Sequence, residues 1–394
     1  MAVTRRRLLQ VASAAAGGAS TIPIGGPFFD AVAHEVTEPA MGLADALNLF
    51  DFEFIARTQM SPMAYAYISG GAADEITLRE NGESFDRIRL RPRVLVDVST
   101  LSTEISLFGQ DLPHPILLAP TAFHREVHPE GELASVRGAG EADAAMVIST
   151  FANTRVEEIA EAATRPVWFQ LYLQTDRGFT RDLVQRAEDA GCRVLCLTVD
   201  TPILGARNRQ ERAKFSPTHG VPNLWGYQVQ RTEQDLRAGS IYSPLLLSRM
   251  TWTDVDWLLS FARVPVILKG ILDPGDADRA ASSGVAGIVV SNHGARNLDT
   301  LPATIDALPR VVDKVADRLP VLVDGGIRRG TDVLKALALG AKAVLIGRPY
   351  LYGLGIGGSD GVKKSVDILH REFRMAMALT GRVSIKDIDR SVLW

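Results

Sequence analysis

The sequence contains very little cysteine. Among its 394 residues only Cys192 and Cys196 are cysteines, and two cysteines in a chain of this length do not make a disulfide framework. Their Cys-x3-Cys spacing has no histidine nearby, which is a poor arrangement for binding a metal ion. We therefore expect both cysteines to be core residues, and we predict no metal site.

The sequence also lacks an excess of positive charge. Lysine and arginine number 43 against 46 aspartates and glutamates, so the net charge is −3 at pH 7. Nucleic-acid binding depends on a basic field, so the composition argues against a nucleic-acid partner. Hydrophobic residues make up 46% of the chain, which is enough for a large core. Chains of this length can form a single α/β barrel.

The N-terminal segment differs from the rest of the chain. Thr4-Arg5-Arg6-Arg7-Leu8-Leu9-Gln10 precedes the apolar run 11–16, and the small-residue triplet Ala31-Val32-Ala33 follows. This order is typical of a secretory signal peptide, and the paired arginines indicate twin-arginine export. The alternatives are a basic tail and a membrane anchor, but the apolar run falls short of the roughly 20 residues that a span needs. We predict a signal peptide over 1–33, a folded domain over 34–394 and an exported (periplasmic or extracellular) protein without stable membrane insertion.

Beyond about residue 45 the pattern predicts a helical segment and then a barrel. Met63–Tyr67 and the run up to Phe85 have helical character. Eight short apolar runs follow, rich in valine, isoleucine and leucine as in parallel strands buried on both faces. The runs are Pro115–Pro120, Met146–Thr150, Val167–Tyr172, Val194–Asp200, Val264–Gly270, Gly287–Ser291, Pro320–Gly325 and Ala343–Pro349. Because amphipathic stretches separate them, we predict a (β/α)8 TIM barrel with an N-terminal helical segment.

One connection in this barrel is much longer than the others. The gap from Val194 to Val264 contains Pro217, Gly220 and Trp225 and predicts a long loop after strand four. Such loops often cover active sites. It has no continuous apolar stretch, so we predict no membrane-docking segment there.

Polar or glycine-rich residues follow the strands. Active sites of such barrels lie at the C-terminal ends of the strands, and burying unpaired charges such as Lys269, Asp324 and Arg348 in a core is costly. We therefore expect a polar pocket at this mouth. Glycines after strands seven and eight, at 325–326 and 347, favour a phosphate-bearing ligand, because glycine lets backbone N–H groups approach phosphate oxygens.

Several motifs together resemble one family. The run Ser291-Asn292-His293-Gly294-Ala295-Arg296-Asn297-Leu298-Asp299 is similar to the active-site signature of the FMN-dependent 2-hydroxy-acid oxidases and dehydrogenases. Further matches between about Phe52 and Asp387 are Thr77-Leu78-Arg79-Glu80-Asn81, Ala119-Pro120-Thr121-Ala122, His128-Pro129-Glu130-Gly131-Glu132, Phe169-Gln170-Leu171-Tyr172, Leu197-Thr198-Val199-Asp200-Thr201-Pro202 and Asp324-Gly325-Gly326. The resemblance implies FMN as cofactor and oxidation of an L-2-hydroxy acid to a 2-oxo acid.

The resemblance also implies roles for individual residues. His293 would be the base, and Asp200 would orient it and favour the imidazolium, since a neighbouring carboxylate raises a histidine pKa. Arg296 and Arg207 would hold the substrate carboxylate, and Tyr67 and Tyr172 would hydrogen-bond the substrate. Lys269 would stabilise negative charge on the flavin. The other implied cofactor contacts are Pro120, Thr121, Ala122, Thr150, Gln170, Thr198, Ser291, Asp324, Gly325, Gly326, Ile327, Arg328, Gly347 and Arg348.

Two positions depart from the signature, and two suggest the substrate. Asn297 stands where glutamine is common and Thr150 where serine is common, but both keep a hydrogen-bonding group. Phe123, followed by His124, and Phe151 suggest an aromatic-lined pocket. This favours a larger, mandelate-like acid over glycolate.

Two kinds of electron acceptor are compatible with these motifs. Molecular oxygen would give hydrogen peroxide, whereas a quinone or cytochrome would make the enzyme a dehydrogenase; the absence of a docking segment favours oxygen. The family implies a homo-oligomer, a tetramer. Two other classes of protein are alternatives: another FMN- or phosphate-binding barrel enzyme and a non-catalytic flavin binder. The combined presence of His293, Asp200 and Arg207 argues against both.

Overall fold

The computed structural model describes residues 41–229, 237 and 240–394. The predicted signal peptide over 1–33 lies outside the described residues, as does part of the long loop after the fourth barrel strand.

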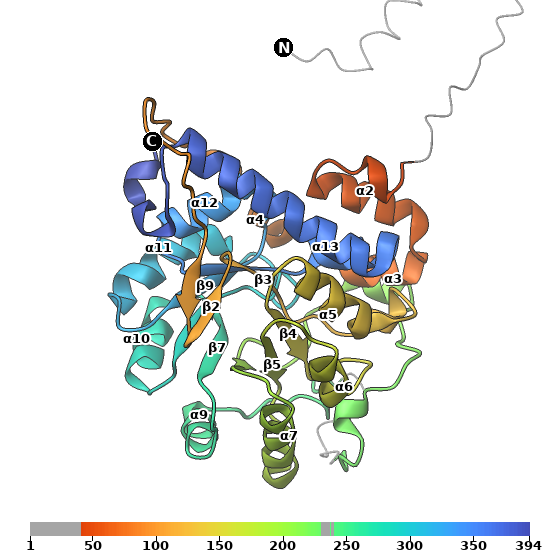
Figure 1. Ribbon diagram of the computed structural model, residues 1–394. Helices are drawn as coiled ribbons and strands as arrows, with labels where there is room; N and C mark the ends of the chain where they lie inside the picture. Colours follow the sequence, from red (N-terminus) through yellow and green to blue (C-terminus); the bar gives the residue numbers. More distant parts are fainter. Residues whose placement is uncertain (1–40, 230–236, 238–239) are drawn as a thin grey trace, which may run out of the picture. The chain divides into compact units, whose positions relative to one another are not determined.

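Eight parallel strands close into a barrel, which confirms the predicted fold class (Figure 1). The strands, in the order in which they pair around the barrel, are β3 (Ile116–Leu118), β4 (Met146–Ser149), β5 (Val167–Leu171), β6 (Leu195–Thr198), β7 (Val266–Ile271), β8 (Gly287–Val290), β9 (Val321–Asp324) and β10 (Ala343–Ile346). β10 pairs in turn with β3 and closes the ring.

Most strands are shorter than the sequence predicts. The first predicted run, Pro115–Pro120, contains only the strand Ile116–Leu118, because prolines at its ends have no N–H to donate to a neighbouring strand. β7 instead extends one residue beyond its prediction, and its pairing with β8 shifts register between Lys269 and Ile271. Gly270 between them has φ 113°, and a Cβ there would overlap the side chain of Asp200. Glycine therefore allows two site residues to lie next to this strand.

Helices surround the barrel and connect its strands (Figure 1). Those that follow strands are α5 (Gly131–Glu141), α6 (Val156–Glu161), α7 (Arg177–Asp189), α9 (Trp252–Leu259), α10 (Pro274–Ser282), α11 (Thr304–Val315), α12 (Gly330–Ala338) and α13 (Arg348–Leu379). Short 3-10 turns are η1 (Leu43–Asp45), η2 (His124–Glu126), η3 (Pro222–Leu224), η4 (Ile385–Asp387) and η5 (Arg390–Val392).

The predicted N-terminal helical segment is confirmed as three helices: α2 (Leu49–Gln59), α3 (Pro62–Ser69) and α4 (Ile76–Arg87). α2 lies along α13, which also packs against α5 (Figure 1). α13 is interrupted at Gly357 and Gly358, where the backbone leaves helical geometry. α3 and α4 bring N-terminal residues to the C-terminal mouth of the barrel, where Tyr67 and Ile68 line a cavity.

A small hairpin that the sequence analysis missed contributes to the core inside the barrel. Strands β1 (Ile105–Leu107) and β2 (Gln110–Leu112) pair antiparallel, and Leu107 and Leu112 belong to the same cluster as the inward-facing strand residues. Phe108 contacts the buried Trp168 edge-on with ring centroids 5.5 Å apart. The hairpin completes an apolar interior, so the polar cavity lies at the other end of the strands.

Both cysteines are buried and unpaired, as predicted; Cys196 lies in the barrel interior. Burial raises the pKa of both thiols to about 12, which keeps them protonated and unreactive.

The long connection after β6 is confirmed, and its described part contains the short helix α8 (Asn208–Arg212) and η3 before α9 begins. Within the described residues, no helix combines the length and the apolar character needed to cross a membrane.

Candidate active site

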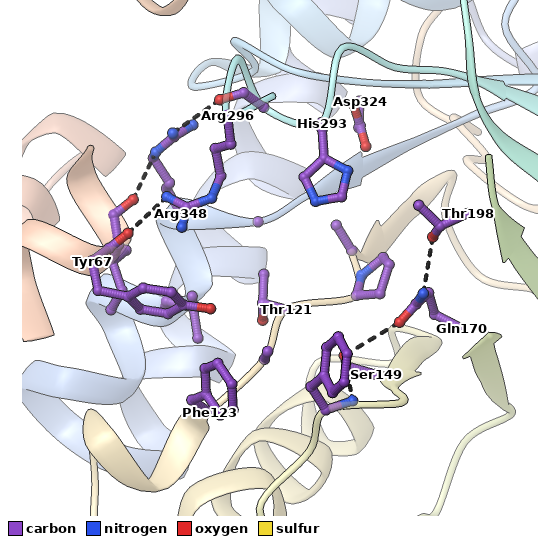
Figure 2. A pocket seen from close by; sticks show the side chains of 18 of the residues that line it. Tyr67, Thr121, Phe123, Ser149, Gln170, Thr198, His293, Arg296, Asp324 and Arg348 are labelled. Carbon is purple, nitrogen blue, oxygen red and sulfur yellow. Dashed lines mark hydrogen bonds between the residues drawn. The ribbon is translucent and has the colours of Figure 1, made fainter. Parts of the chain in front are cut away.

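A cavity of about 390 Å³ opens at the C-terminal ends of the barrel strands. Figure 2 shows that its labelled side chains come from different elements and surround one space. The predicted residues that line it are Tyr67, Pro120, Thr121, Ala122, Gln170, Tyr172, Thr198, Arg207, Lys269, His293, Arg296, Asp324, Gly325, Gly326, Ile327, Arg328, Gly347 and Arg348. The structure thus brings together residues that are up to 281 positions apart, from Tyr67 to Arg348.

Three predicted residues do not line the cavity. Asp200 lies behind His293, while Thr150 and Ser291 are fully buried. The Thr150 hydroxyl donates to the Gln170 carbonyl at 2.7 Å and accepts from the Tyr172 N–H at 3.1 Å. Ser149 lines the cavity from that strand instead. The Thr150 hydroxyl therefore joins β4 to β5, and its contact with the cofactor stays a prediction.

The Ser291 hydroxyl likewise serves its neighbours. It accepts from the Lys269 ammonium at 2.9 Å and from the His293 N–H at 3.0 Å. Lys269 also forms an ion pair with Asp324 at 3.1 Å. Burial lowers the pKa of Lys269, but Asp324 and Asp200 outweigh it and raise the pKa overall, so the ammonium stays charged. Ser291 thus fixes a buried cation that faces the cavity.

His293 and Asp200 form a hydrogen-bonded pair at the mouth. His293 Nδ1 lies 2.8 Å from Asp200 Oδ1, and the Thr201 hydroxyl lies 3.2 Å from the same nitrogen. Because an ionised carboxylate only accepts, Nδ1 carries the proton and donates it to Asp200. In the neutral ring this leaves a lone pair on Nε2.

Burial decides the resting charge of this pair. It lowers the pKa of His293 below its ordinary value, although Asp200 acts in the opposite direction. Burial opposes ionisation of Asp200, but His293, Lys269 and Thr201 together lower its pKa. Asp200 raises the pKa of His293, as the motif implies, but burial has the larger effect and the net direction is downward. The result is a neutral imidazole beside an ionised carboxylate.

Backbone geometry presents His293 to the cavity. His293, Gly294 and Ala295 all have left-handed φ values, 57°, 61° and 61°, which non-glycine residues adopt only where the surroundings compensate the strain. Asn292 provides part of that compensation. Its side chain exchanges two hydrogen bonds with Asn81 of α4, at 3.0 and 2.8 Å.

The end of the signature is anchored to the same helix. Asp299 accepts backbone N–H groups of Asp74, Ile76 and Thr77 at 3.1, 3.2 and 2.9 Å, so it satisfies free donors at the start of α4. In the sequence, Asn81 and Asp299 stand out only as members of the family motifs. Their roles depend on a contact between segments more than 200 residues apart, and no local pattern reveals it.

Three arginines approach the cavity, and none of them pairs with an acidic side chain among the described residues. Arg296 donates to the carbonyls of Tyr67 and Gly70 at 2.7 and 2.9 Å, and its guanidinium lies over the Tyr67 ring, 4.9 Å from the centroid. Burial, followed by repulsion from Arg207, lowers the pKa of Arg296 to about 9, so the group remains charged at neutral pH.

Arg207 donates to the Arg296 carbonyl at 3.1 Å and to Asn297 Oδ1 at 3.2 Å. Asn297 in turn donates to the Asp200 carbonyl at 2.9 Å and to the Thr201 hydroxyl at 2.8 Å. The asparagine that departs from the family signature therefore connects Arg207 to the loop that carries Asp200.

Arg348, at the start of α13, donates to the carbonyls of Ile68, Gly70 and Gly294, each at 2.9 Å. Within the described part of the chain, the hydrogen bonds of Arg207, Arg296 and Arg348 all go to carbonyl or amide oxygens and none to a carboxylate. Three buried or half-buried cations without an anion are costly. The site is therefore suited to a ligand that carries negative charge.

The glycines after β9 fit the predicted phosphate site. Gly325 and Gly326 have φ values of 97° and 81°, and a Cβ on Gly326 would overlap the backbone of Asn81. The N–H groups before α12 are already taken, since Asp332 accepts from Arg328 and Arg329. The start of α13 has no side-chain cap at Gly347, so its N-terminus is the one open to an anion.

A wall of aromatic rings closes another side of the cavity. Phe123 and Phe151, the two aromatic residues expected from the sequence, both line it. The ring centroids of Phe151 and Tyr172 lie 5.1 Å apart. The sequence analysis did not identify the wall residues from the long loop after β6. These are Leu204, Gln210, Phe215, Pro217, Val221, Ser243, Leu245 and Leu246. In the sequence, only the unusual length of that loop indicated that it contributes to the cavity.

Comparison with known proteins agrees with this geometry. Residues 56–394 match the model of the FMN-dependent dehydrogenase family. An L-lactate oxidase of Nostoc sp. is 46% identical over 360 residues, covering 89% of this chain and 99% of the relative. A peroxisomal (S)-2-hydroxy-acid oxidase of Oryza sativa subsp. japonica is 46% identical over 347 residues, covering 88% and 95%.

Solved structures give the same result. A mandelate oxidase with benzoyl-formic acid superposes with a TM-score of 0.80 at 39% identity, covering 89% of this chain and 98% of the other. A mutant flavocytochrome b2 with pyruvate bound gives 0.82 at 37% identity, covering 90% and 88%.

The fold and the site define a barrel enzyme that binds an anionic ligand beside a histidine–aspartate pair. The chain belongs to the FMN-dependent 2-hydroxy-acid oxidase and dehydrogenase family, as its motifs predicted, and FMN is its cofactor.

The site geometry predicts that Arg348 contributes to FMN affinity. Replacing Arg348 with methionine removes a cation from the open N-terminus of α13. Hydrogen bonds to charged groups are worth about 1.5–3 kcal/mol, so the FMN dissociation constant should rise about 10- to 150-fold. Arg371→Met, an exposed position on the same helix, is the matched control. Titration of each apoprotein with FMN measures the effect, and equal affinities in the two variants would count against the phosphate site.

Proposed function

We propose that this protein is an FMN-dependent (S)-2-hydroxy-acid oxidase that converts an L-2-hydroxy acid and O2 to a 2-oxo acid and H2O2. The observation that carries the proposal is the His293–Asp200 pair at 2.8 Å, in a cavity where Arg207 and Arg296 have no carboxylate partner among the described residues. Oxidation of a 2-hydroxy acid requires a base to take its proton and positive charge to bind its carboxylate. His293 and the two guanidinium groups would meet these two requirements.

The residues present suit FMN. The left-handed glycines at 325 and 326, the open start of α13 and Arg328 and Arg348 would hold its phosphate. Asp324 Oδ1 is buried without a partner within the described chain, which leaves an acceptor for a polar group of the ligand. Lys269, Gln170, Thr121 and Thr198 would contact the ring system. FMN, when bound, supplies an acceptor for the two electrons that leave the substrate.

His293 would act as the base. Its Nδ1–H is held by Asp200, so Nε2 is the position that takes a proton from the substrate. The imidazolium that forms would lie 2.8 Å from an ionised carboxylate, which stabilises it as charge develops. Burial keeps the ring neutral before the reaction, and Asp200 compensates the charge after it.

Arg296 and Arg207 would bind the substrate carboxylate. Both guanidinium groups are anchored by carbonyl or amide oxygens, so their positions are fixed before the substrate arrives. A carboxylate placed between them would also relieve the repulsion that lowers the pKa of Arg296. Tyr67 and Tyr172 line the same space, and burial raises the pKa of both phenols, so each remains a hydrogen-bond donor.

The aromatic wall supports a substrate with a large apolar side chain. Phe123, Phe151 and Phe215 offer ring faces on the side of the cavity next to Tyr67 and Tyr172. The likeness to mandelate oxidase structures agrees with this choice, whereas the lactate oxidase relative points to a smaller acid. The ratio of kcat/KM for (S)-mandelate to that for L-lactate measures the preference, and a ratio well below one would contradict it.

Oxygen is the acceptor that we propose because the curated relatives cited above are named oxidases. The flavocytochrome b2 likeness keeps a cytochrome or quinone acceptor as the second candidate. Assembly as a homo-oligomer, a tetramer, stays a prediction from the family resemblance, and sedimentation of the holoenzyme measures it.

The proposed reaction predicts a yellow holoenzyme that an (S)-2-hydroxy acid bleaches without oxygen. In air, the same acid should yield one peroxide for each 2-oxo acid formed. General-base catalysis contributes typically about 10²- to 10⁴-fold, so His293→Ala should lose at least the lower part of that range in turnover while it retains its flavin. A protein that binds FMN but is bleached by no 2-hydroxy acid would refute the function. Unchanged turnover in His293→Ala would refute the role of the base.

We propose further that residues 1–33 direct twin-arginine export, on the basis of Arg5 and Arg6 before the apolar run 11–16. In a bacterium with that pathway, replacing both arginines with lysine should leave the full-length precursor in the cytoplasm. Arg7→Lys is the control and should be exported normally. Cell fractionation followed by mass spectrometry of the N-terminus distinguishes these results, and export of the double variant would exclude the twin-arginine route.

A further inference from the structure

A buried carboxylate joins two loops beside the substrate end of the cavity. Glu126, at the end of η2 in the connection after β3, has only 4% of its side chain exposed. Its Oε1 accepts the backbone N–H groups of Thr218 and His219 at 2.6 and 2.9 Å. The Thr218 hydroxyl donates to Oε2 at 3.0 Å, and His219 Nδ1 lies 3.1 Å from Oε1.

These contacts are directed at one short segment of the long loop after β6. Two consecutive backbone donors converge on one oxygen, which fixes the direction of the chain there and not only the position of a side chain. Within the described residues, Glu126 has no lysine or arginine as an ion-pair partner. The segment 218–219 therefore supplies the compensation for its buried charge.

The same segment carries part of the aromatic wall. Phe215 lies three residues before Thr218, and its ring stacks on Tyr67 with centroids 4.1 Å apart and planes 9° from parallel. Phe215 also lies 6.2 Å from Phe123. Both Phe215 and Pro217 line the cavity, and the contacts at 218–219 begin one to three residues from these two side chains.

A second attachment is weaker. Asn153, in the connection after β4, donates to the Gly220 carbonyl at 3.0 Å. It is itself held by Glu132, which accepts its N–H at 2.9 Å. Asn153 secures the far end of the segment with neutral hydrogen bonds to the carbonyls of His219, at 3.5 Å, and Gly220, whereas Glu126 provides several that involve a charge.

We propose that Glu126 is a positioning residue for substrate specificity: its carboxylate holds residues 215–219 so that Phe215 completes the wall around the substrate's side chain. The proposal rests on the proposed function, because it concerns the side chain of the 2-hydroxy acid. Glu126 does not line the cavity, so it acts through Phe215.

The test compares Glu126→Ala and Glu126→Gln with Glu130→Ala in the FMN-loaded full chain. Glu130 is exposed and pairs with Arg137, and its side chain has no hydrogen bond to a described residue of the loop, which makes it a matched control. For each protein, kcat/KM is measured with (S)-mandelate and with L-lactate. Cleavage by trypsin after the exposed Lys214 reports, independently of activity, whether the segment is held.

We expect Glu126→Ala to reduce kcat/KM for mandelate about tenfold or more relative to that for lactate, and to speed cleavage after Lys214. Loss of binding contacts worth about 1.4 kcal/mol corresponds to that factor. Glu126→Gln keeps an oxygen that accepts the N–H groups and should lie between Glu126→Ala and the wild type. Glu130→Ala should match the wild type in both measurements.

A double-mutant cycle with Phe215→Ala separates positioning from general damage. If Glu126 acts through Phe215, the double variant should lose no more mandelate selectivity than Phe215→Ala alone. Additive losses, or an equal loss for both acids with unchanged cleavage, would overturn the inference. A wild-type enzyme that oxidises neither acid, nor any other 2-hydroxy acid, would instead refute the proposed function, so the two failures are distinguishable.

Discussion

The hydrogen bond between His293 Nδ1 and Asp200 Oδ1, 2.8 Å long, is the interaction on which the rest of the site depends. It joins the ends of β6 and β8 and determines which ring nitrogen faces the cavity. It also places a carboxylate where it would compensate the positive charge of an imidazolium. Much of the surrounding structure maintains it. The bulge at Gly270 leaves room for Asp200, and the Asn81–Asn292 pair supports the left-handed backbone that presents His293.

Charge balance explains the remainder of the cavity. Lys269 is paired with Asp324, whereas Arg207, Arg296 and Arg348 rely on carbonyl and amide oxygens. Two of these arginines lie near His293 and one lies at the start of α13, which supports the proposal of separate carboxylate and phosphate sites within one cavity.

The alternation of apolar runs with amphipathic stretches predicted the barrel, and the polar residues after those runs predicted a polar pocket at one mouth. The family resemblance implied most of the individual residues that line it. Thr150 shows the limit of that reasoning, since a residue next to a strand end can face either the cavity or the neighbouring strand. Here the adjacent Ser149 lines the cavity, and Thr150 bonds to the neighbouring strand. The effect of Asp200 on the His293 pKa was predictable, but the larger effect of burial was not, because burial cannot be read from a motif. The packing of the β1–β2 hairpin on the barrel interior, the anchoring by Asp299 and the contact between Glu126 and Thr218 depend on distant segments meeting, which local patterns do not encode.

The central claim is that buried, neutral His293 is the base, with Asp200 as its permanent partner. The most direct test is the pH dependence of the second-order rate constant of anaerobic bleaching by a subsaturating (S)-2-hydroxy acid, measured by rapid mixing, because this constant reports ionisations of the free enzyme. Because a protonated imidazole cannot take a proton and burial lowers the pKa of His293 below its ordinary value of 6.5, the rate should be constant at neutral pH. It should fall only in acid, with an apparent pKa below about 6.5. A rate that increases as the pH falls, or one that is identical in His293→Gln across the whole range, would contradict the account.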